Sequence, residues 1–165
     1  MQRFMMILCV ALFASGAQAK DKIVDMADMD AGHNIEITQI TDPSATAATG
    51  MFRFDPAIVY LDPGDAVVFL NSRGEHTVHS AVPLWPEGKE LVAISNQKRA
   101  EVRFDQAGVF GFRCKRHGQY GMAMLVIVGD VSEVASIEEP VSTMKARPRE
   151  KAAFLAIWQE HLDRR

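Results

Sequence analysis

Short runs of alternating apolar and polar residues recur along the chain from residue 34 to residue 129. A period of two is typical of β-strands, because successive side chains of a strand point to opposite faces of a sheet. Stretches rich in Pro, Gly and Asp separate the runs and predict turns. The predicted strands are Asn34–Thr41, Met51–Phe54, Ala57–Leu61, Ala66–Leu70, Glu101–Phe104, Val109–Cys114 and Met122–Val128. With about one further strand in the region 71–100, whose centre is loop-like, this pattern predicts an all-β sandwich over residues 34–129.

The composition changes after Gly129, and residues 130–165 predict a helical extension. Asp130 is a capping residue type and predicts a short helix that runs through Ile137. A second helix is predicted from Arg149 to Leu162, because one helical face gathers Phe154, Leu155, Trp158 and Leu162. We expect both helices to pack on the sandwich. A helix that binds a partner or a membrane surface is the alternative, but it lacks a strongly basic polar face.

The first nineteen residues have the three parts of a secretory signal peptide. Arg3 supplies the positive end, residues 4–14 form the apolar run, and Ala17-Gln18-Ala19 is a small-x-small cleavage site. The apolar run is too short for a membrane anchor, and Cys9 lies inside it rather than at a lipoprotein cleavage site. We therefore expect export to the periplasm with cleavage after Ala19. Residues 20–33 predict a flexible segment, whose Met, Asp and His33 side chains are more typical of a solvated tail than of a copper site.

Composition and charge exclude several classes of protein. The formal net charge is −3, which argues against nucleic-acid binding by the whole molecule. No apolar stretch after residue 20 approaches the roughly 20 residues of a membrane-spanning helix, so no stable membrane insertion is expected. Once the signal peptide is removed, Cys114 is the only cysteine left. A lone thiol in an oxidising compartment is buried, reactive or metal-bound.

One constellation carries the chemistry. Cys114, His117 and Met122 form a Cys-x2-His-x4-Met loop between two predicted strands, and His76 follows an earlier strand. Two imidazoles, one thiolate and one weak thioether are the ligand set of a blue-copper electron-transfer site. Each residue has an ordinary alternative, namely a buried inert thiol, a surface histidine or a core methionine. Their coincidence with export and strand flanks favours copper, and a zinc site would usually have more thiolate or a carboxylate.

The chain resembles the small cupredoxins, and most closely the pseudoazurins, over about residues 34–165. The residues that carry the resemblance are Phe54-Asp55-Pro56-Ala57, Pro63 to Phe69, His76-Thr77-Val78, Pro86-Glu87-Gly88, Gly108 and the loop from Cys114 to Met122. The resemblance implies an eight-stranded Greek-key sandwich with two C-terminal α-helices and one copper ion. It implies His76, Cys114 and His117 as equatorial ligands and Met122 as the axial ligand, with His79 as a competitor for the place of His76.

The chain departs from the family at three positions around these ligands. Thr77 stands where the family usually has Asn, Lys115 where it has Thr or Ser, and Arg116 where it tends to have Pro. The family joins the first two positions by a hydrogen bond. Since such bonds orient metal ligands, the departures predict a loop that is held less stiffly.

The resemblance implies a periplasmic carrier of single electrons and not an enzyme. Its partners would be redox proteins, such as a c-type cytochrome, a dehydrogenase or a nitrite reductase, and it would act as a monomer. The His117 edge would reach the surface through a rim for which Trp85, Pro86, Gly118 and Tyr120 are candidates, although Trp85 could equally be a core aromatic. Basic residues exceed acidic ones between Asn71 and Met122. This excess would steer the protein toward an acidic partner, and scattered solvated charge is an equal alternative.

Two alternatives come from other classes. A copper enzyme would need a His directly beside the copper-binding Cys to pass electrons to a second copper centre. Arg113 and Lys115 flank Cys114 instead. A nucleophilic Cys114–His117 pair is conceivable, but the spacing is first a metal-ligand spacing. Periplasmic copper storage or delivery would use the same ligands, and the sequence does not separate it from electron transfer.

Overall fold

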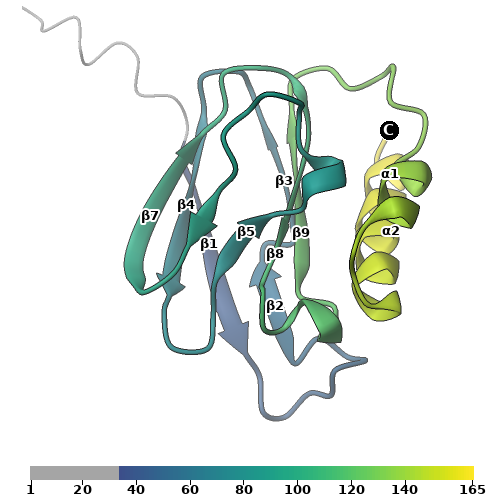
Figure 1. Cartoon of the computed structure of the whole chain (residues 1–165). Coiled ribbons are helices and arrows are strands. Elements are labelled where there is room, and N and C mark those ends of the chain that lie inside the picture. Colours follow the sequence, from purple (N-terminus) through teal and green to yellow (C-terminus); the bar gives the residue numbers. More distant parts are fainter. Residues whose placement is uncertain (1–33) are drawn as a thin grey trace, which may run out of the picture. The chain divides into compact units, whose positions relative to one another are not determined.

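The computed structural model describes residues 34–165, in which two β-sheets face each other and two helices cover one of them (Figure 1). The first sheet has the order β2-β1-β4-β7 and the second the order β3-β9-β8-β5-β6. The strands of the first sheet are β1 (Asn34–Thr41), β2 (Phe52–Asp55), β4 (Ala66–Ser72) and β7 (Gln97–Arg103). Those of the second are β3 (Ile58–Leu61), β5 (Val78–Ser80), β6 (Ala93–Ile94), β8 (Gly108–Arg113) and β9 (Ala123–Val128).

Strand pairing brings the ends of distant strands together. β1 runs parallel to β4, and β3 runs parallel to β9, whereas the remaining neighbours are antiparallel. The pairing of β1 with β4 begins at Asn34 opposite Ala66 and runs to Thr38 opposite Leu70. Because these two strands run in the same direction, the C-terminal end of β1 lies at the same end of the sheet as the segment that follows β4 (Figure 1).

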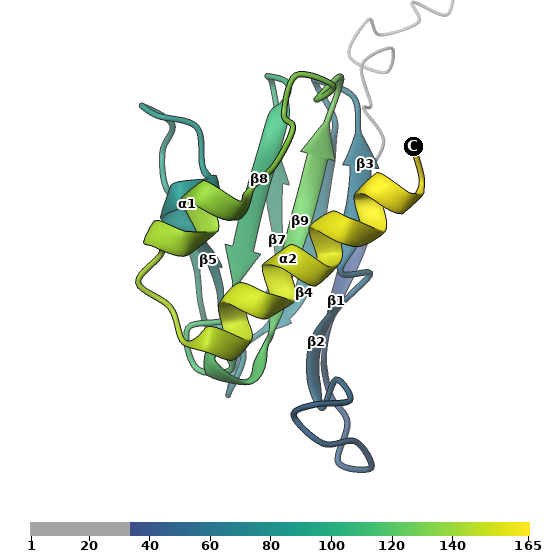
Figure 2. The ribbon, with the colours of Figure 1, turned by 90° about the vertical axis from the view of Figure 1, so that its right-hand side faces the viewer.

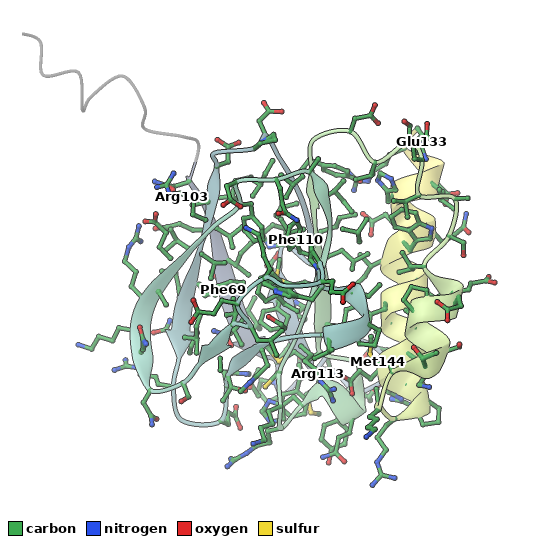
Figure 3. All side chains as sticks on the ribbon, turned by 45° about the horizontal axis from the view of Figure 1, so that its top comes forward. Phe69, Arg103, Phe110, Arg113, Glu133 and Met144 are labelled. Carbon is green, nitrogen blue, oxygen red and sulfur yellow. The ribbon has the colours of Figure 1, made fainter. Side chains whose placement is uncertain are left out.

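The core explains why β9 is apolar along its whole length. Met124, Val126 and Val128 face the other sheet and join the cluster that contains Phe69 and Phe110, two residues that Figure 3 labels. The alternate residues Ala123, Leu125 and Ile127 face the helices and belong to a second cluster. A strand buried on both faces is a continuous apolar run rather than an alternating one.

The helical layer consists of α1 (Glu138–Thr143) and α2 (Pro148–Asp163), and Figure 2 shows α2 running across the outer face of the second sheet. Its buried face is formed by Phe154, Ile157, Trp158 and His161, so the predicted packing of this helix is confirmed. Leu155 and Leu162 of the predicted face are only partly buried and flank it.

The predicted helix from Asp130 to Ile137 is wrong. The Asp130 carboxylate accepts a hydrogen bond from the Ser132 N–H at 2.8 Å and closes a turn instead of capping a helix. Helix α1 begins later, after Ser136, whose hydroxyl accepts the Glu138 N–H at 3.0 Å. Pro140 lies in the first turn of α1, where its missing N–H would have had no helical partner.

The β-sandwich with two C-terminal helices is confirmed, with one strand more than the eight expected. The extra strand is β6, a two-residue pairing with β5 at the sheet edge, too short for an alternation to be visible in the sequence. No helix of the described part is long and apolar enough to cross a membrane. The predicted signal peptide (1–19) and the segment 20–33 lie outside the described residues and stay predictions.

Candidate metal centre

Three predicted ligands meet at one end of the sandwich. The ligand atoms of His76, Cys114 and His117 all lie within 4.8 Å of one another, and among residues 34–165 this is the only such group of His, Cys, Asp or Glu side chains. All three residues are buried, with exposed fractions of 7%, 0% and 4%. His76 comes from the connection between β4 and β5, whereas Cys114 directly follows β8 and His117 precedes the short turn η3 (Gly118–Tyr120).

The loop between β8 and β9 is held by its own backbone. The Gly118 N–H donates to the Cys114 carbonyl at 2.8 Å, and the Met122 N–H donates to the His117 carbonyl at 3.2 Å. The Cys114 N–H in turn donates to the Met122 carbonyl at 3.2 Å. These bonds place Met122, the fourth predicted ligand, beside Cys114, and both are fully buried in the same apolar cluster.

In each histidine ring, Nδ1 faces the ligand group and Nε2 faces away from it. His117 Nδ1 lies 3.8 Å from the Cys114 sulfur. His76 Nδ1 is buried without a hydrogen-bond partner, while its Nε2 lies 3.0 Å from the Thr41 hydroxyl. Burial lowers the pKa of both histidines, more than the nearby Glu75 carboxylate raises it. The neutral rings that result are the form that binds metals.

The donor set fits copper. An orphaned buried nitrogen carries a desolvation cost that a bound metal ion would remove. A thiolate and a thioether suit Cu(I), and imidazole suits both oxidation states. No carboxylate belongs to the buried donor group, which argues against Ca²⁺ or Mg²⁺.

Thr77 joins the two halves of the centre. Its hydroxyl accepts the Lys115 N–H at 3.0 Å and lies 3.8 Å from the Cys114 sulfur. Positions 77 and 115 are therefore joined by a hydrogen bond in this chain too, and the expectation of a less firmly held loop stays a prediction. A side-chain-to-backbone bond takes the place of the family's bond and ties the Cys114 segment to the His76 segment.

Sequence reasoning missed Glu75, whose carboxylate faces both imidazoles. Its Oε1 accepts a short hydrogen bond from Thr41 and lies 3.7 Å from His76 Nε2, while its Oε2 lies 3.9 Å from His117 Nε2. The Thr41 hydrogen bond is the main reason why the pKa of Glu75 is lowered. Its position directly before His76 is the one signal in the sequence that could have drawn attention to it.

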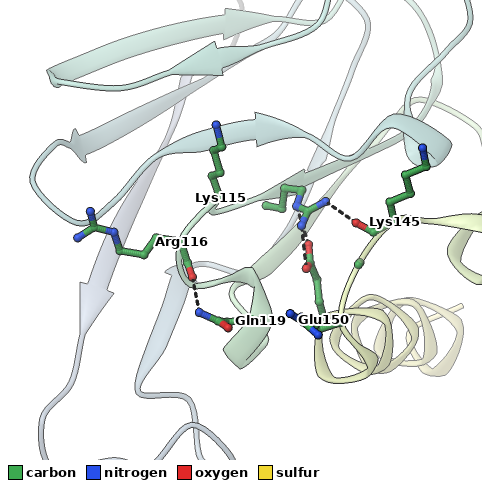
Figure 4. Close-up of a pocket in the computed structure, with 8 residues that line it drawn as sticks. Lys115, Arg116, Gln119, Lys145 and Glu150 are labelled. Atoms are coloured by element: carbon green, nitrogen blue, oxygen red, sulfur yellow. Dashed lines mark hydrogen bonds and ion pairs between the residues drawn. The ribbon is translucent and has the colours of Figure 1, made fainter.

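A second missed glutamate supports the ligand loop from the helical layer (Figure 4). Glu150 of α2 is 1% exposed and forms an ion pair with Arg113, with Oε1 at 2.6 Å from Nε and Oε2 accepting Nη2 at 2.9 Å. A Cβ placed on Gly118 would come within 2.9 Å of this carboxylate. Burial raises the pKa of Glu150, although the Arg113 charge opposes the shift.

The predicted exit rim is partly wrong. His117 does not reach the surface and is 4% exposed. Phe52 stacks on the face of its ring with centroids 3.8 Å apart, and Glu75 lies 3.9 Å from its Nε2 edge. Trp85 packs edge-on against Phe110 and Phe112, as its core alternative predicted. Tyr120 is 41% exposed, whereas Gly118 is buried and Pro86 is half-buried. His79, the competitor for the place of His76, lies on β5 opposite Arg113 and outside the ligand group.

A basic pocket of about 520 Å³ borders the ligand loop (Figure 4). Four exposed cationic side chains line it and have no ion-pair partner among residues 34–165: Lys115, Arg116, Lys145 and Arg147. The first two stand between Cys114 and His117, so this positive surface is continuous with the metal centre.

Comparison with known proteins agrees with this geometry. A model of the family described as "Copper binding proteins, plastocyanin/azurin family" matches residues 41–129. The chain is 43% identical to a pseudoazurin of Methylorubrum extorquens over 81 residues, which are 49% of this chain and 55% of that protein. It is 32% identical to a pseudoazurin of Paracoccus pantotrophus over 110 residues, which are 66% of this chain and 76% of that protein. The crystal structure of pseudoazurin from Methylobacterium extorquens AM1 superposes with a TM-score of 0.61 and 28% identity, covering 77% of this chain and 98% of that one.

Proposed function

The chain belongs to the plastocyanin/azurin family of copper-binding proteins, and on that premise we propose that it is a periplasmic blue copper protein that carries single electrons. The observation that carries the proposal is the buried group formed by His76, Cys114 and His117. These residues would hold the ion through two imidazole nitrogens and the thiolate, with Met122 as a weak axial donor. A bound copper ion supplies the one-electron Cu(II)/Cu(I) couple.

The protein's own contribution is to hold the donors in place and to exclude water. The ligand loop is closed by backbone hydrogen bonds, and the first histidine is fixed from outside by Thr41. Donors that are already in place need little rearrangement when an electron arrives or leaves. Burial of all three residues keeps solvent from the Cys114 sulfur and would keep it from a bound ion.

Redox proteins with an acidic docking surface are the partners that this chain would meet as a monomer. The surface beside the ligand loop presents Lys115, Arg116, Lys145 and Arg147, none of which forms an ion pair among residues 34–165, and opposite charges steer protein encounters. A c-type cytochrome, a dehydrogenase or a nitrite reductase would fit this role. We expect the rate of electron exchange with such a partner to fall as ionic strength rises, and stopped-flow measurement over a salt series tests this. A flat or rising dependence contradicts steering.

Copper storage or delivery would use the same ligands, but burial favours the carrier. A delivery protein must pass its ion to an acceptor, which needs exposed donors that can exchange ligands. Here the Cys114 sulfur is inaccessible and both imidazoles are almost so. We expect fast electron self-exchange and slow transfer of copper to a chelator; the reverse pair of results would assign the protein to delivery.

The visible spectrum of the copper-loaded protein tests the ligand set. The wild-type protein should show an intense band that ascorbate bleaches and an oxidant restores. Cys114→Ser should abolish the band, because the thiolate is its source. His79→Gln is the matched control, since this imidazole lies outside the ligand group, and the band should persist. A colourless wild-type protein, or equal loss in both variants, would overturn the proposal.

A further inference from the structure

The outer edge of the His76 ring is met by a chain of two side chains. Its Nε2 lies 3.0 Å from the Thr41 hydroxyl, and that hydroxyl forms a short hydrogen bond with the Glu75 carboxylate. The inner nitrogen, Nδ1, has no hydrogen-bond partner. Thr41 is the last residue of β1, and the parallel pairing of β1 with β4 brings it to the edge from which the Glu75–His76 segment departs.

Counting protons allows one arrangement of these three groups. An ionised carboxylate only accepts hydrogen bonds, and a threonine hydroxyl has a single proton to donate. The Thr41 proton must therefore point to Glu75. The contact between Thr41 and His76 then requires the proton to be on Nε2 of the ring. A neutral imidazole has one N–H, so Nδ1 of His76 is left with a free lone pair.

The same carboxylate lies near the second imidazole. Glu75 Oε2 is 3.9 Å from His117 Nε2, a distance that allows electrostatic attraction but no hydrogen bond. The Glu75 side chain is 44% exposed, so solvent screens its charge in part. One negative charge thus faces the outer edges of both rings whose inner nitrogens belong to the metal centre.

We propose that Glu75, acting through Thr41, is a positioning residue that sets the tautomer of His76 before any metal binds. The relay keeps Nδ1 unprotonated and turned toward Cys114 and His117, so that copper meets a prepared donor. The role of the free lone pair rests on the function proposed above, whereas the tautomer is a property of the metal-free protein. A second consequence is electrostatic: the Glu75 charge favours Cu(II) over Cu(I).

The tautomer is tested in the metal-free protein by ¹⁵N NMR of its imidazole nitrogens at pH 8. Wild type should show His76 with the proton on Nε2 alone. Thr41→Val has nearly the same shape but no hydroxyl, and should show a mixture of tautomers. Thr41→Ser restores the hydroxyl and should restore the single tautomer. A single Nε2–H tautomer in Thr41→Val, or an Nδ1–H tautomer in wild type, would overturn the proposal.

The charge is tested in the copper-loaded protein with Glu75→Gln, which keeps an acceptor for Thr41. We expect the Cu(I)/Cu(II) ratio at a fixed solution potential to rise by about threefold to tenfold; tenfold corresponds to 59 mV for a one-electron couple. The matched control is Glu36→Gln on β1, an equal charge change at a residue that pairs with Arg99. It should leave the ratio near that of wild type. Equal ratios in Glu75→Gln and wild type would overturn the electrostatic part.

The two measurements separate this proposal from the proposed function. If the protein bound no copper, the NMR result on the metal-free chain would still decide the tautomer. If copper bound and gave the blue band while Thr41→Val kept a single tautomer, the proposed carrier function would be supported. The proposed role of Glu75 and Thr41 in setting the His76 tautomer would be wrong.

Discussion

Two glutamates border the metal centre, and they differ in exposure and in the direction in which their pKa is shifted. Glu75 is 44% exposed at its side chain, and a hydrogen bond from Thr41 lowers its pKa. Glu150 is 1% exposed, and burial raises its pKa in spite of the Arg113 guanidinium beside it. Glu75 lies 3.7 Å from His76 and 3.9 Å from His117, the two proposed imidazole ligands. Glu150 lies against Gly118 of the ligand loop.

This difference predicts two different roles: Glu75 would influence the redox balance of the centre, and Glu150 would contribute to the stability of the fold. A charge that is partly solvated costs little to ionise and can bias the oxidation state of a nearby ion. A charge that is wholly buried depends on its partner, because a lost partner leaves it uncompensated. We therefore expect changes around Glu75 to move the redox balance at little cost in stability. Changes around Glu150 should move stability first.

The largest effect is expected for Arg113→Met. This change leaves the Glu150 carboxylate buried without its cation, and loss of one partner of a buried pair should lower the free energy of unfolding by about 3 kcal/mol. Urea unfolding of the metal-free protein at pH 8 measures it. The matched control is Arg99→Met, which breaks the exposed pair with Glu36 and should cost about 0.5 kcal/mol.

A double variant decides whether the uncompensated charge is the cause. Arg113→Met combined with Glu150→Gln removes both charges, and it should recover much of the lost stability because a neutral pair carries no ionic desolvation cost. If the double variant were as unstable as Arg113→Met alone, packing of the arginine stem rather than charge would be responsible. The contrast between the two glutamates would then lose its basis.

The proposed loop ligands could be brought together from the sequence because they are local. Cys114, His117 and Met122 share one short loop, which backbone hydrogen bonds close. His76 needed the family resemblance to be preferred over His79, since both follow the same strand. The alternating strands were predictable for the same local reason, and β6 was not because two residues cannot show a period.

The supporting residues could not be predicted because they meet through tertiary pairing. Thr41 reaches Glu75 only because β1 and β4 are parallel neighbours, and Glu150 reaches Gly118 only because α2 crosses the second sheet. No spacing rule connects residues so far apart in the chain. The burial of His117 was missed likewise, because its cover comes from Phe52 on the other sheet.

A smaller effect is expected where the two halves of the centre are joined, at Thr77. Thr77→Val removes the acceptor for the Lys115 N–H and should cost about 1 kcal/mol in free energy of unfolding. The hydroxyl can also donate toward the Cys114 sulfur, and such a bond stabilises the electron-rich thiolate of the Cu(I) form. Its loss should therefore lower the Cu(I)/Cu(II) ratio, opposite in sign to Glu75→Gln.

Thr77→Ser keeps the hydroxyl and is the control for this change. Potentiometric titration of the copper-loaded variants gives the redox balance, and amide hydrogen exchange at Lys115 reports the lost bond in the metal-free protein. A rise of the ratio in Thr77→Val would show that the hydroxyl does not act as a donor to the sulfur. Unchanged exchange at Lys115 would show that water replaces the bond without loss.

The smallest effect is expected in how the stability loss caused by Arg113→Met depends on pH. Burial holds the pKa of Glu150 above its ordinary value of 4.5, and removal of the neighbouring cation raises it further. A native state with a raised carboxyl pKa binds a proton before the unfolded state does, so its stability rises as the pH falls toward 4.5. The stability gap between Arg113→Met and wild type should thus be narrower at pH 5 than at pH 8, as measured by urea unfolding. The double variant with Gln at position 150 has no such carboxyl, so its stability gap to wild type should not narrow at pH 5. If the gap of Arg113→Met did not narrow either, Glu150 would not be the group that titrates, and its burial would not be what sets it apart from Glu75.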